Sequence, residues 1–250
     1  MKAFKNIVPI ILFAFSLTCC SDFFLDCYEG NGVPDSKDIS ASEIDDFDEI
    51  ECTGSYSIIV DGDTSKRYIR IEGDENLIDR IVIDERGTTL HIELEDNECI
   101  TSELGIKIYI GTPVLEYIEL EGEGDIIINN LYEDNLETTI SGEGDISVYN
   151  TTVTHRFTAS IEGKGAINAT GKCTYAEYYI DGEGKIYADN FVSSYCKVDI
   201  DGLCLAAYVN ANKTLDVKID GTGYVYYTGN VTEDNITTDI DGIGNVDPKN

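Results

Sequence analysis

Short glycine motifs are the feature of this sequence that most resembles a chemical site. The stretch SGEGDI at residues 141–146 returns as EGEGDI, EGKGAI, DGEGKI, DGLCLA, DGTGYV and DGIGNV. A G-x-G loop binds a dinucleotide phosphate when a helix follows it, because the helix N-terminus supplies amide donors. Here a strand-like alternating run follows each motif. The motifs are therefore not expected to bind a nucleotide.

An acidic residue stands directly before the first glycine of each motif, except where Ser141 takes its place. Stacked carboxylates repel one another unless they are screened, protonated or bridged by a cation such as calcium. We favour another interpretation, in which these acids accept N–H bonds within the turn and face water. No cofactor is expected, and calcium is the alternative that remains open. The candidate metal ligands are Glu121, Glu162, Asp181, Asp201, Asp220 and Asp241.

Acidic residues are too numerous for any pair of them to mark a catalytic site. The chain holds 48 aspartates and glutamates, and its two histidines, His91 and His155, stand outside any nucleophile motif. Catalytic residues commonly break the pattern of their scaffold, whereas these acids follow it. We therefore expect no catalytic residue and no enzyme. A polysaccharide lyase or hydrolase built on a β-helix is the alternative.

Tyrosines offer a better candidate for recognition. The chain has 16 tyrosines and no tryptophan. A tyrosine ring is rigid and apolar but carries a hydroxyl, which suits contact with a sugar or a protein. The competing interpretation is that rings on successive turns only pack against each other. The candidate ligand face comprises Tyr149, Tyr187, Tyr224 and Tyr226.

The glycine motifs recur every 19 to 21 residues, which is the spacing of a solenoid. Apolar residues stand two before and four after the first glycine, as with Ile140 and Ile146 or Ile200 and Ala206. Period-two alternation on both sides of a glycine corner predicts two strands per repeat. We predict a parallel β-coil with one turn per repeat; a β-sandwich or meander is the alternative. The corner glycines are Gly122, Gly142, Gly163, Gly182, Gly202, Gly221 and Gly242.

A second corner is predicted eight residues after each corner glycine. Only asparagine and glycine occur there, and these residues adopt the left-handed backbone conformation at least cost. The positions are Asn130, Asn150, Gly171, Asn190, Asn210, Gly229 and Asn250.

The N-terminus is typical of a secretory signal. Lys2 and Lys5 precede the apolar run IVPIILFAFSL, which suits a signal peptide and is too short to span a bilayer. The stretch LTCC at residues 17–20 resembles the lipobox of bacterial lipoproteins, which implies a lipid on Cys20. Cys19 is the alternative anchor, and an ordinary cleaved signal is the alternative without an anchor.

These patterns divide the chain into a signal peptide (1–19), a flexible tether (20–45), an N-terminal β region (46–115) and the repeats (116–250). Export permits disulfides, and the scattered cysteines form no zinc motif. Their pairing stays open. The formal charge of −31 disfavours nucleic acid as a partner. Membrane contact through the lipid, and an extracellular or periplasmic protein or glycan, remain as partners.

The run from Phe47 to Gly229 resembles the bacterial head GIN domain, a family of unknown function described as a "putative autotransporter adhesin". SGEGDI and its relatives match the family's repeated motif, and LDVKIDGTGYVYYTGN at residues 215–230 matches its closing pattern. The resemblance implies a right-handed parallel β-helix and a location in the cell envelope, here at the outer membrane. DGLCLA departs from the pattern because Cys204 replaces the second glycine, so this corner is expected to be distorted or tied by a disulfide. We therefore expect an envelope lipoprotein that acts as a binding or adhesion module, with a divalent-cation-binding structural protein as a further alternative.

Overall fold

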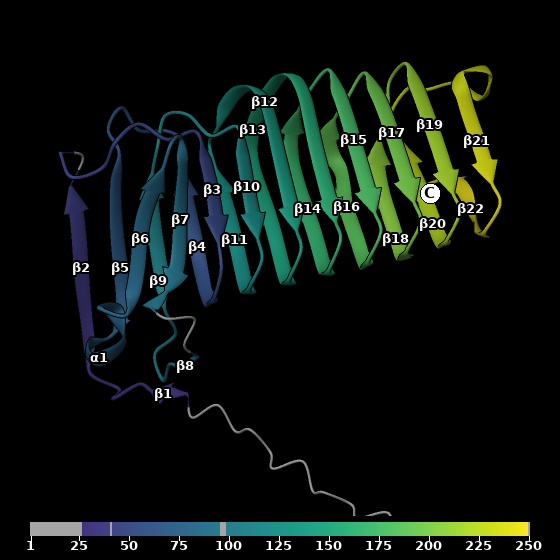
Figure 1. The fold of residues 1–250 in the computed structure, drawn as a ribbon. Helices are drawn as coiled ribbons and strands as arrows, with labels where there is room; N and C mark the ends of the chain where they lie inside the picture. Colours follow the sequence, from purple (N-terminus) through teal and green to yellow (C-terminus); the bar gives the residue numbers. More distant parts are fainter. Residues whose placement is uncertain (1–26, 41, 96–98, 250) are drawn as a thin grey trace, which may run out of the picture.

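The repeats stack into one long parallel β-solenoid, seen from the side in Figure 1. The computed structural model describes residues 27–40, 42–95 and 99–249. The predicted all-β parallel coil is confirmed. The expected signal peptide and Cys20 lie outside the described residues.

Two stacks of parallel strands form the walls of the solenoid, one on each side of the glycine corners. The long strand β13 (Glu143–Ile161) contributes its first part to the second stack and its last part to the first. The first stack holds β7 (Thr89–Leu94), β3 (Glu49–Cys52), β10 (Tyr117–Leu120), β12 (Tyr132–Ile140), β15 (Tyr175–Ile180), β17 (Tyr195–Ile200), β19 (Thr214–Ile219) and β21 (Ile236–Ile240). The second holds β9 (Lys107–Gly111), β4 (Ser55–Asp61), β11 (Glu123–Asn129), β14 (Lys164–Lys172), β16 (Glu183–Val192), β18 (Leu203–Asn210), β20 (Thr222–Thr228) and β22 (Ile243–Pro248). A short 3-10 helix, Glu233–Asn235, precedes β21.

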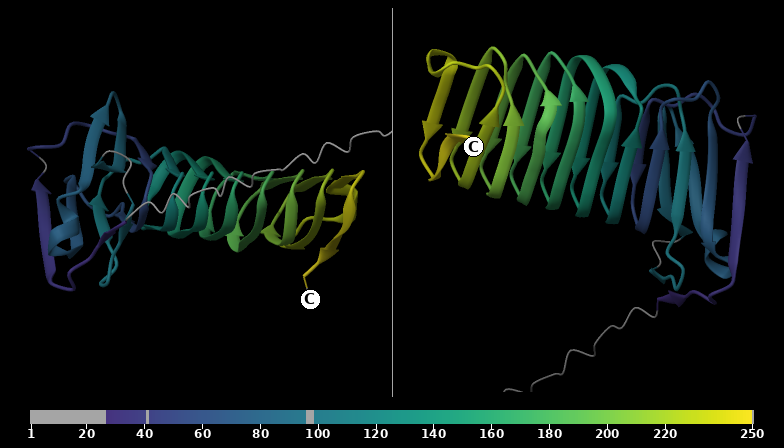
Figure 2. Two further views of the ribbon diagram at one scale, coloured as in Figure 1. Left: turned by 60° about the horizontal axis from the view of Figure 1, so that its bottom comes forward. Right: turned by 180° about the vertical axis from the view of Figure 1, so that it is seen from behind.

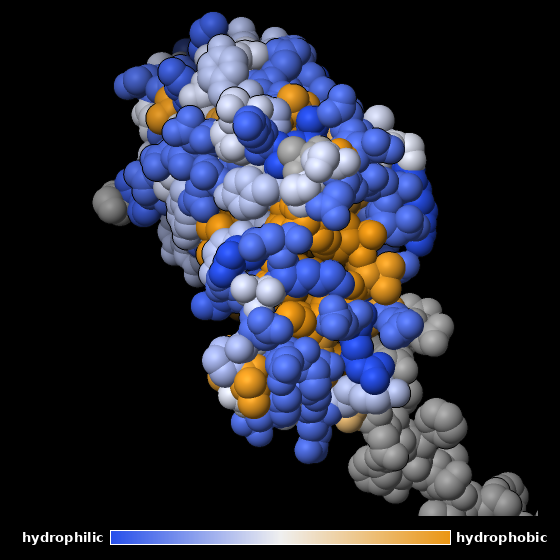
Figure 3. Space-filling model, turned by 90° about the vertical axis from the view of Figure 1, so that its left-hand side faces the viewer, coloured by the Kyte–Doolittle hydropathy of each residue, from blue (hydrophilic) through white to orange (hydrophobic). Residues whose placement is uncertain are grey.

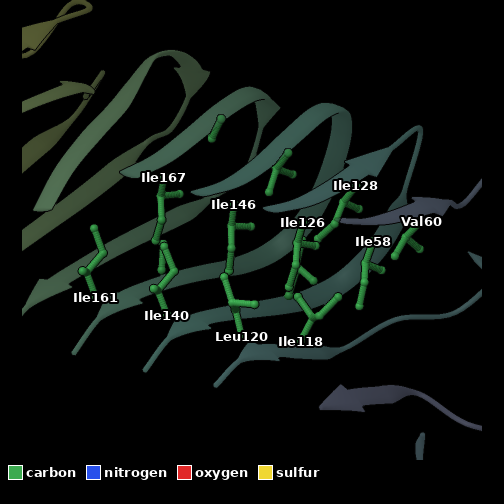
Figure 4. Packing of buried hydrophobic residues seen from close by; sticks show 14 of the residues in the cluster. Ile58, Val60, Ile118, Leu120, Ile126, Ile128, Ile140, Ile146, Ile161 and Ile167 are labelled. Carbon is green, nitrogen blue, oxygen red and sulfur yellow. The ribbon is translucent and has the colours of Figure 1, made fainter. Parts of the chain in front are cut away.

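Equivalent residues of successive turns lie in register, so each apolar column becomes a ladder inside the solenoid. Ile126 pairs with Ile146, which pairs with Ile167, and all three are fully buried. Figure 4 shows these side chains with Ile140 and Ile161 of the facing wall, pointing into the space between the strands. Burying one such side chain contributes about 1.5–3 kcal/mol. Because a single turn cannot bury its own apolar face, stability comes from the stack.

The corner glycines lie in the bends between the two walls, where successive turns come closest. A Cβ atom on Gly142 would lie 2.0 Å from the carbonyl oxygen of Gly122, and one on Gly163 would lie 2.0 Å from that of Gly142. No side chain fits at that distance. Glycine is required here by the approach of one backbone to the next.

The second corner follows the prediction in some turns and departs from it in others. Asn130 and Asn150 have positive φ values of 58° and 52°, and Gly171 and Gly229 are also at positive φ. Asn190 and Asn210 are not, so a left-handed corner in every repeat was wrong. The register shifts between β14 and β16, so that Asn190 pairs with Thr170 and not with Gly171. Asn250 lies outside the described residues.

The DGLCLA corner is distorted, as expected, and it is not tied by a disulfide. Cys204 is a buried free thiol. Between Cys204 and Ala207 the register slips, and Ala207 takes the place that pairs with Ile186 and Val225. Ala207 is fully buried and Ala206 only partly so, which corrects the prediction that Ala206 is a core residue. One extra residue forms a β-bulge here.

A cap closes the N-terminal end of the solenoid. It consists of β2 (Pro34–Ser40), β5 (Tyr68–Asp74), α1 (Glu75–Ile78) and β6 (Ile81–Arg86), with the short pair β1 (Tyr28–Glu29) and β8 (Ile100–Thr101) beneath. β2 pairs antiparallel with β5, and β5 with β9, at the end of the second wall, as Figure 2 shows from two sides. Seen from this end in Figure 3, apolar side chains form a band bordered by hydrophilic residues.

The described residues of the expected tether belong to this cap. Residues 34–40 form the full length of β2, and a disulfide joins Cys27 to Cys99. A free tether at these positions was therefore wrong, because seven consecutive residues are fixed by ladder hydrogen bonds. Asp74 holds the cap together: the Gly32 N–H donates to its carboxylate at 2.7 Å and the Ser102 hydroxyl at 2.5 Å. None of the helices in the described ranges has the length and apolarity to cross a bilayer.

Candidate functional site

Three tyrosines form a ladder on the outer side of the second wall. Tyr187 of β16 stacks on Tyr208 of β18 with ring centroids 5.7 Å apart and planes at 11°. Tyr208 stacks on Tyr226 of β20 at 5.2 Å and 19°. The ladder follows from register, because the three residues occupy equivalent places in successive turns. We call Tyr187, Tyr208 and Tyr226 the tyrosine ladder.

The structure brings together only part of the predicted tyrosine face. Tyr187 and Tyr226 belong to the ladder, while Tyr149 and Tyr224 are exposed and make no ring contact with it. Tyr208 links the two predicted members. It was missed because the bulge places it six residues after its corner glycine, whereas Tyr187 and Tyr226 stand five after theirs. Aligning the strand that follows DGLCLA one residue later would have found it.

A hollow of about 370 Å³ lies beside the first ring of the ladder. The small residues Gly165, Ala166 and Gly184 line part of it. Tyr187 and Leu205 form its apolar sides. The bulge turns Leu205 outward, and 51% of its surface is exposed. We call this space the ladder hollow.

The ladder hollow has a charge balance unlike the rest of the chain. Lys164, Lys185, Asp145 and Glu183 line it, two cations and two anions. In the whole sequence acids outnumber lysines and arginines by 48 to 17. No hydrogen bond or ion pair joins the side chains of the two lysines or of Glu183 to another described residue. Asp145 accepts the Ala166 N–H at 2.8 Å through one oxygen, which leaves the other free.

The acidic column is exposed along its length. The corner N–H groups donate to carbonyls of the preceding turn, as Gly142 does to Leu120, and the acids do not accept them as the favoured interpretation required. Glu121 accepts the Thr53 hydroxyl at 3.0 Å, and Asp220 pairs with Lys218. Across residues 27–40, 42–95 and 99–249, no group of three or more His, Cys, Asp or Glu side chains is arranged to hold a metal ion.

The two histidines are separate from each other and from the ladder hollow. His91 lies 3.0 Å (Nδ1 to Oε2) from Glu51, on the first wall. His155 packs edge-on against Tyr175 at 5.3 Å, and Tyr175 stacks on Tyr195 at 4.8 Å. This second ring stack, on β15 and β17, was not predicted. Its rings come from the same kind of register as the tyrosine ladder.

Comparison with known proteins places the chain in a family. Residues 46–231 match the family described as "Putative auto-transporter adhesin, head GIN domain". The chain belongs to this family. No curated protein matches the sequence of this head GIN domain protein.

Solved structures share the fold of this head GIN domain protein. A protein of Bacteroides fragilis described as a "putative adhesin" is 22% identical with a TM-score of 0.77, over 88% of this chain and 99% of its own. A Parabacteroides distasonis protein described as a "putative lipid binding protein" is 23% identical with a TM-score of 0.65, over 89% and 99%. A "putative adhesin" of Parabacteroides merdae is 20% identical with a TM-score of 0.60, over 90% and 100%. At these identities the likeness concerns the fold.

Proposed function

We propose that this protein is a non-catalytic binding or adhesion module of the bacterial cell envelope, held at the outer membrane by a lipid on Cys20. The observation that carries the proposal is the tyrosine ladder beside a hollow in which the side chains of Lys164, Lys185 and Glu183 form no hydrogen bond or ion pair with another described residue. Aromatic rings with polar neighbours are the usual anchors of recognition surfaces. The family's description as an adhesin and the lipobox-like LTCC support the same class and location.

The polysaccharide-enzyme alternative has less support. General acid–base catalysis needs a side chain positioned at the reacting bond and a pKa matched to its task. Asp145 and Glu183 line the ladder hollow, but one oxygen of Asp145 already accepts the Ala166 N–H. Binding, which needs only complementary contacts, accounts for the arrangement.

The tyrosine ladder provides the first test. We expect the triple variant Tyr187→Ala, Tyr208→Ala, Tyr226→Ala to lose binding at least about tenfold, since removing anchor contacts worth about 1.4 kcal/mol has that effect. The measurement is binding of the purified mature protein to an array of glycans and extracellular matrix proteins. Tyr132→Ala is the matched control, because Tyr132 is 70% exposed on β12 outside the ladder. Equal binding by the triple variant would remove the ladder from the proposal.

The anchor provides a second test. Cys20→Ala is expected to abolish incorporation of radiolabelled fatty acid during expression in the envelope, while Cys19→Ala keeps it. The two residues are adjacent, so both variants preserve the apolar run that directs export. Label lost only in Cys19→Ala would move the anchor by one residue. An unlabelled wild-type protein would eliminate the lipid.

A further inference from the structure

We infer that the ladder hollow is a subsite for a single sugar ring of a neutral glycan. The inference rests on the proposed binding function and names the class of ligand. The hollow's volume of about 370 Å³ lies within the range of small-molecule sites, about 300–1,000 Å³. It is built where the fold breaks its own pattern, at the bulge between Cys204 and Ala207, and bulges commonly redirect a side chain next to a functional site.

The apolar side of the hollow suits the C–H face of a pyranose ring. Tyr208 stacks on one face of Tyr187, and Lys249 lies over Tyr208 with its Nζ 4.9 Å from the ring centroid. The middle of the ladder is thus covered. On the other side of Tyr187 the paired residue is Asn168, so the ladder ends at Tyr187, next to the hollow. Leu205 adds an exposed apolar surface from the next turn.

The polar side of the hollow suits hydroxyl groups. A hydroxyl both donates and accepts hydrogen bonds, so its partners must include both kinds. Lys164 and Lys185 supply donors only, and Asp145 and Glu183, when ionised, supply acceptors only. The side chains of Lys164, Lys185 and Glu183 form no hydrogen bond or ion pair with another described side chain, so these groups are available to a ligand.

The charge balance selects a neutral ligand. An acidic polysaccharide approaching this chain meets a formal charge of −31 before it meets two lysines. A basic ligand gains no net attraction in the hollow itself, because two lysines offset its two carboxylates. A neutral sugar ring can form hydrogen bonds with all four charged groups. It is repelled neither by the two lysines nor by the two carboxylates.

The experiment measures titration of the mature protein with neutral gluco-, galacto- and manno-oligosaccharides by saturation-transfer NMR and calorimetry. Matched arms use oligogalacturonate, as an acidic glycan, and phosphatidylcholine vesicles. We expect at least one neutral oligosaccharide to bind, with saturation transfer to its ring protons. Lys185→Met and Glu183→Gln should each weaken that binding at least about tenfold, as loss of a charge-assisted hydrogen bond of about 1.4 kcal/mol predicts.

Lys172→Met and Glu137→Gln are the matched controls, because both residues are exposed and neither lines the hollow. Urea midpoints equal to wild type establish that the variants are folded. Binding of no neutral sugar, or binding unchanged in Lys185→Met and Glu183→Gln, would overturn the inference. Binding of oligogalacturonate, vesicles or an array protein that is lost in the ladder variant would also overturn it, while the proposed binding function would stand. Array binding that is lost in no variant would count against both.

Discussion

Replacing Gly142 by alanine is expected to destabilise the protein by about 3 kcal/mol, the upper end of the cost of overpacking. The added Cβ would lie 2.0 Å from the Gly122 carbonyl oxygen and 2.5 Å from that of Glu121. Both are backbone atoms, so no side chain can move aside. The two turns must separate, which also strains the hydrogen bonds from Gly142 N–H to Leu120 and from Glu143 N–H to Gly122. The measurement is the urea midpoint with its slope.

Position along the solenoid supplies the control for this prediction. A Cβ on Gly242 would lie 2.0 Å from the Gly221 carbonyl oxygen, so the local clash is the same. Gly242 belongs to the last turn that the structure describes, where β21 pairs with β19 and β22 pairs with β20 and with no other described strand. Within the described solenoid this turn can shift without disturbing another one, so Gly242→Ala should cost clearly less. Glu143→Ala, an exposed change in the same corner as Gly142, should stay within about 0.5 kcal/mol.

Equal costs at Gly142 and Gly242 would contradict this account. They would mean that the loss of stability arises within one corner and not from the contacts of that turn with the turns before and after it. A stacked solenoid gains its stability from contacts between neighbouring turns, so an interior turn has two interfaces to lose and a terminal turn has one.

The regular part of the fold was predictable because the residue types that produce each strand and corner recur at the same positions in every repeat. Each column of the sequence corresponds to one ladder in space, so Ile126, Ile146 and Ile167 could be placed in one column before their contacts were known. The glycines could be placed at the corners in the same way. Their physical role was clear only from the structure, since the distance between successive turns depends on how the whole stack packs.

The candidate site was predicted only in part, and the reason is a single residue. Counting from the corner glycine places Ala206 inward. At the position of Tyr187 and Tyr226, five residues after the glycine, the same count finds no tyrosine in the repeat between them. The bulge shifts both, so that Ala207 faces inward and Tyr208 completes the ladder. A one-residue insertion reverses which face of a strand every later side chain occupies. Counting residues at a fixed period cannot detect such an insertion unless the pairing with the neighbouring strands is already known.

The N-terminal cap was not predictable from the repeat. Its strand β2 pairs antiparallel with β5, which is about 30 to 40 residues further along the chain, as Lys37 does with Ile71, and no column of the sequence relates them. The pairing of Cys27 with Cys99 was open for the same reason. Composition alone made the N-terminal segment resemble a tether. Ladder bonds and one buried carboxylate fix it instead.

That carboxylate gives the second large effect: Asp74→Asn is expected to cost about 2–3 kcal/mol, the range for a lost hydrogen bond to a charged group with a buried partner left unsatisfied. Asp74 is fully buried and accepts the Ser102 hydroxyl, the Gly32 N–H at 2.7 Å and the Leu104 N–H at 3.3 Å. An asparagine has the same shape, but its NH₂ group replaces one carboxylate oxygen. A hydrogen-bond donor would then face groups that are themselves donors. The cap should loosen first, so limited proteolysis should cut near residues 27–40 before the solenoid unfolds.

The pH dependence separates this carboxylate from a simple packing effect. The hydrogen bond from Ser102, with those from Gly32 and Leu104, lowers the pKa of Asp74 against the opposing effect of burial. A carboxyl with a lowered folded-state pKa contributes stability that is fully present above its unfolded pKa, about 3.9. The difference in urea midpoint between wild type and Asp74→Asn should therefore be constant from pH 7 to about pH 5 and shrink as the pH falls through the folded-state pKa.

The matched control is Asp79→Asn. Asp79 forms an exposed ion pair with Lys37 at 3.1 Å, and such pairs contribute about 0–1 kcal/mol. Its effect should be small at every pH, although it removes the same charge from the same cap. A difference for Asp74→Asn that stays constant down to pH 2 would show that the variant is destabilised by its shape. A difference as small as that of Asp79→Asn would show that the cap does not depend on this carboxylate. The expected result, a large cost that disappears with protonation, requires that the ionised carboxylate itself binds the N-terminal segment to the solenoid.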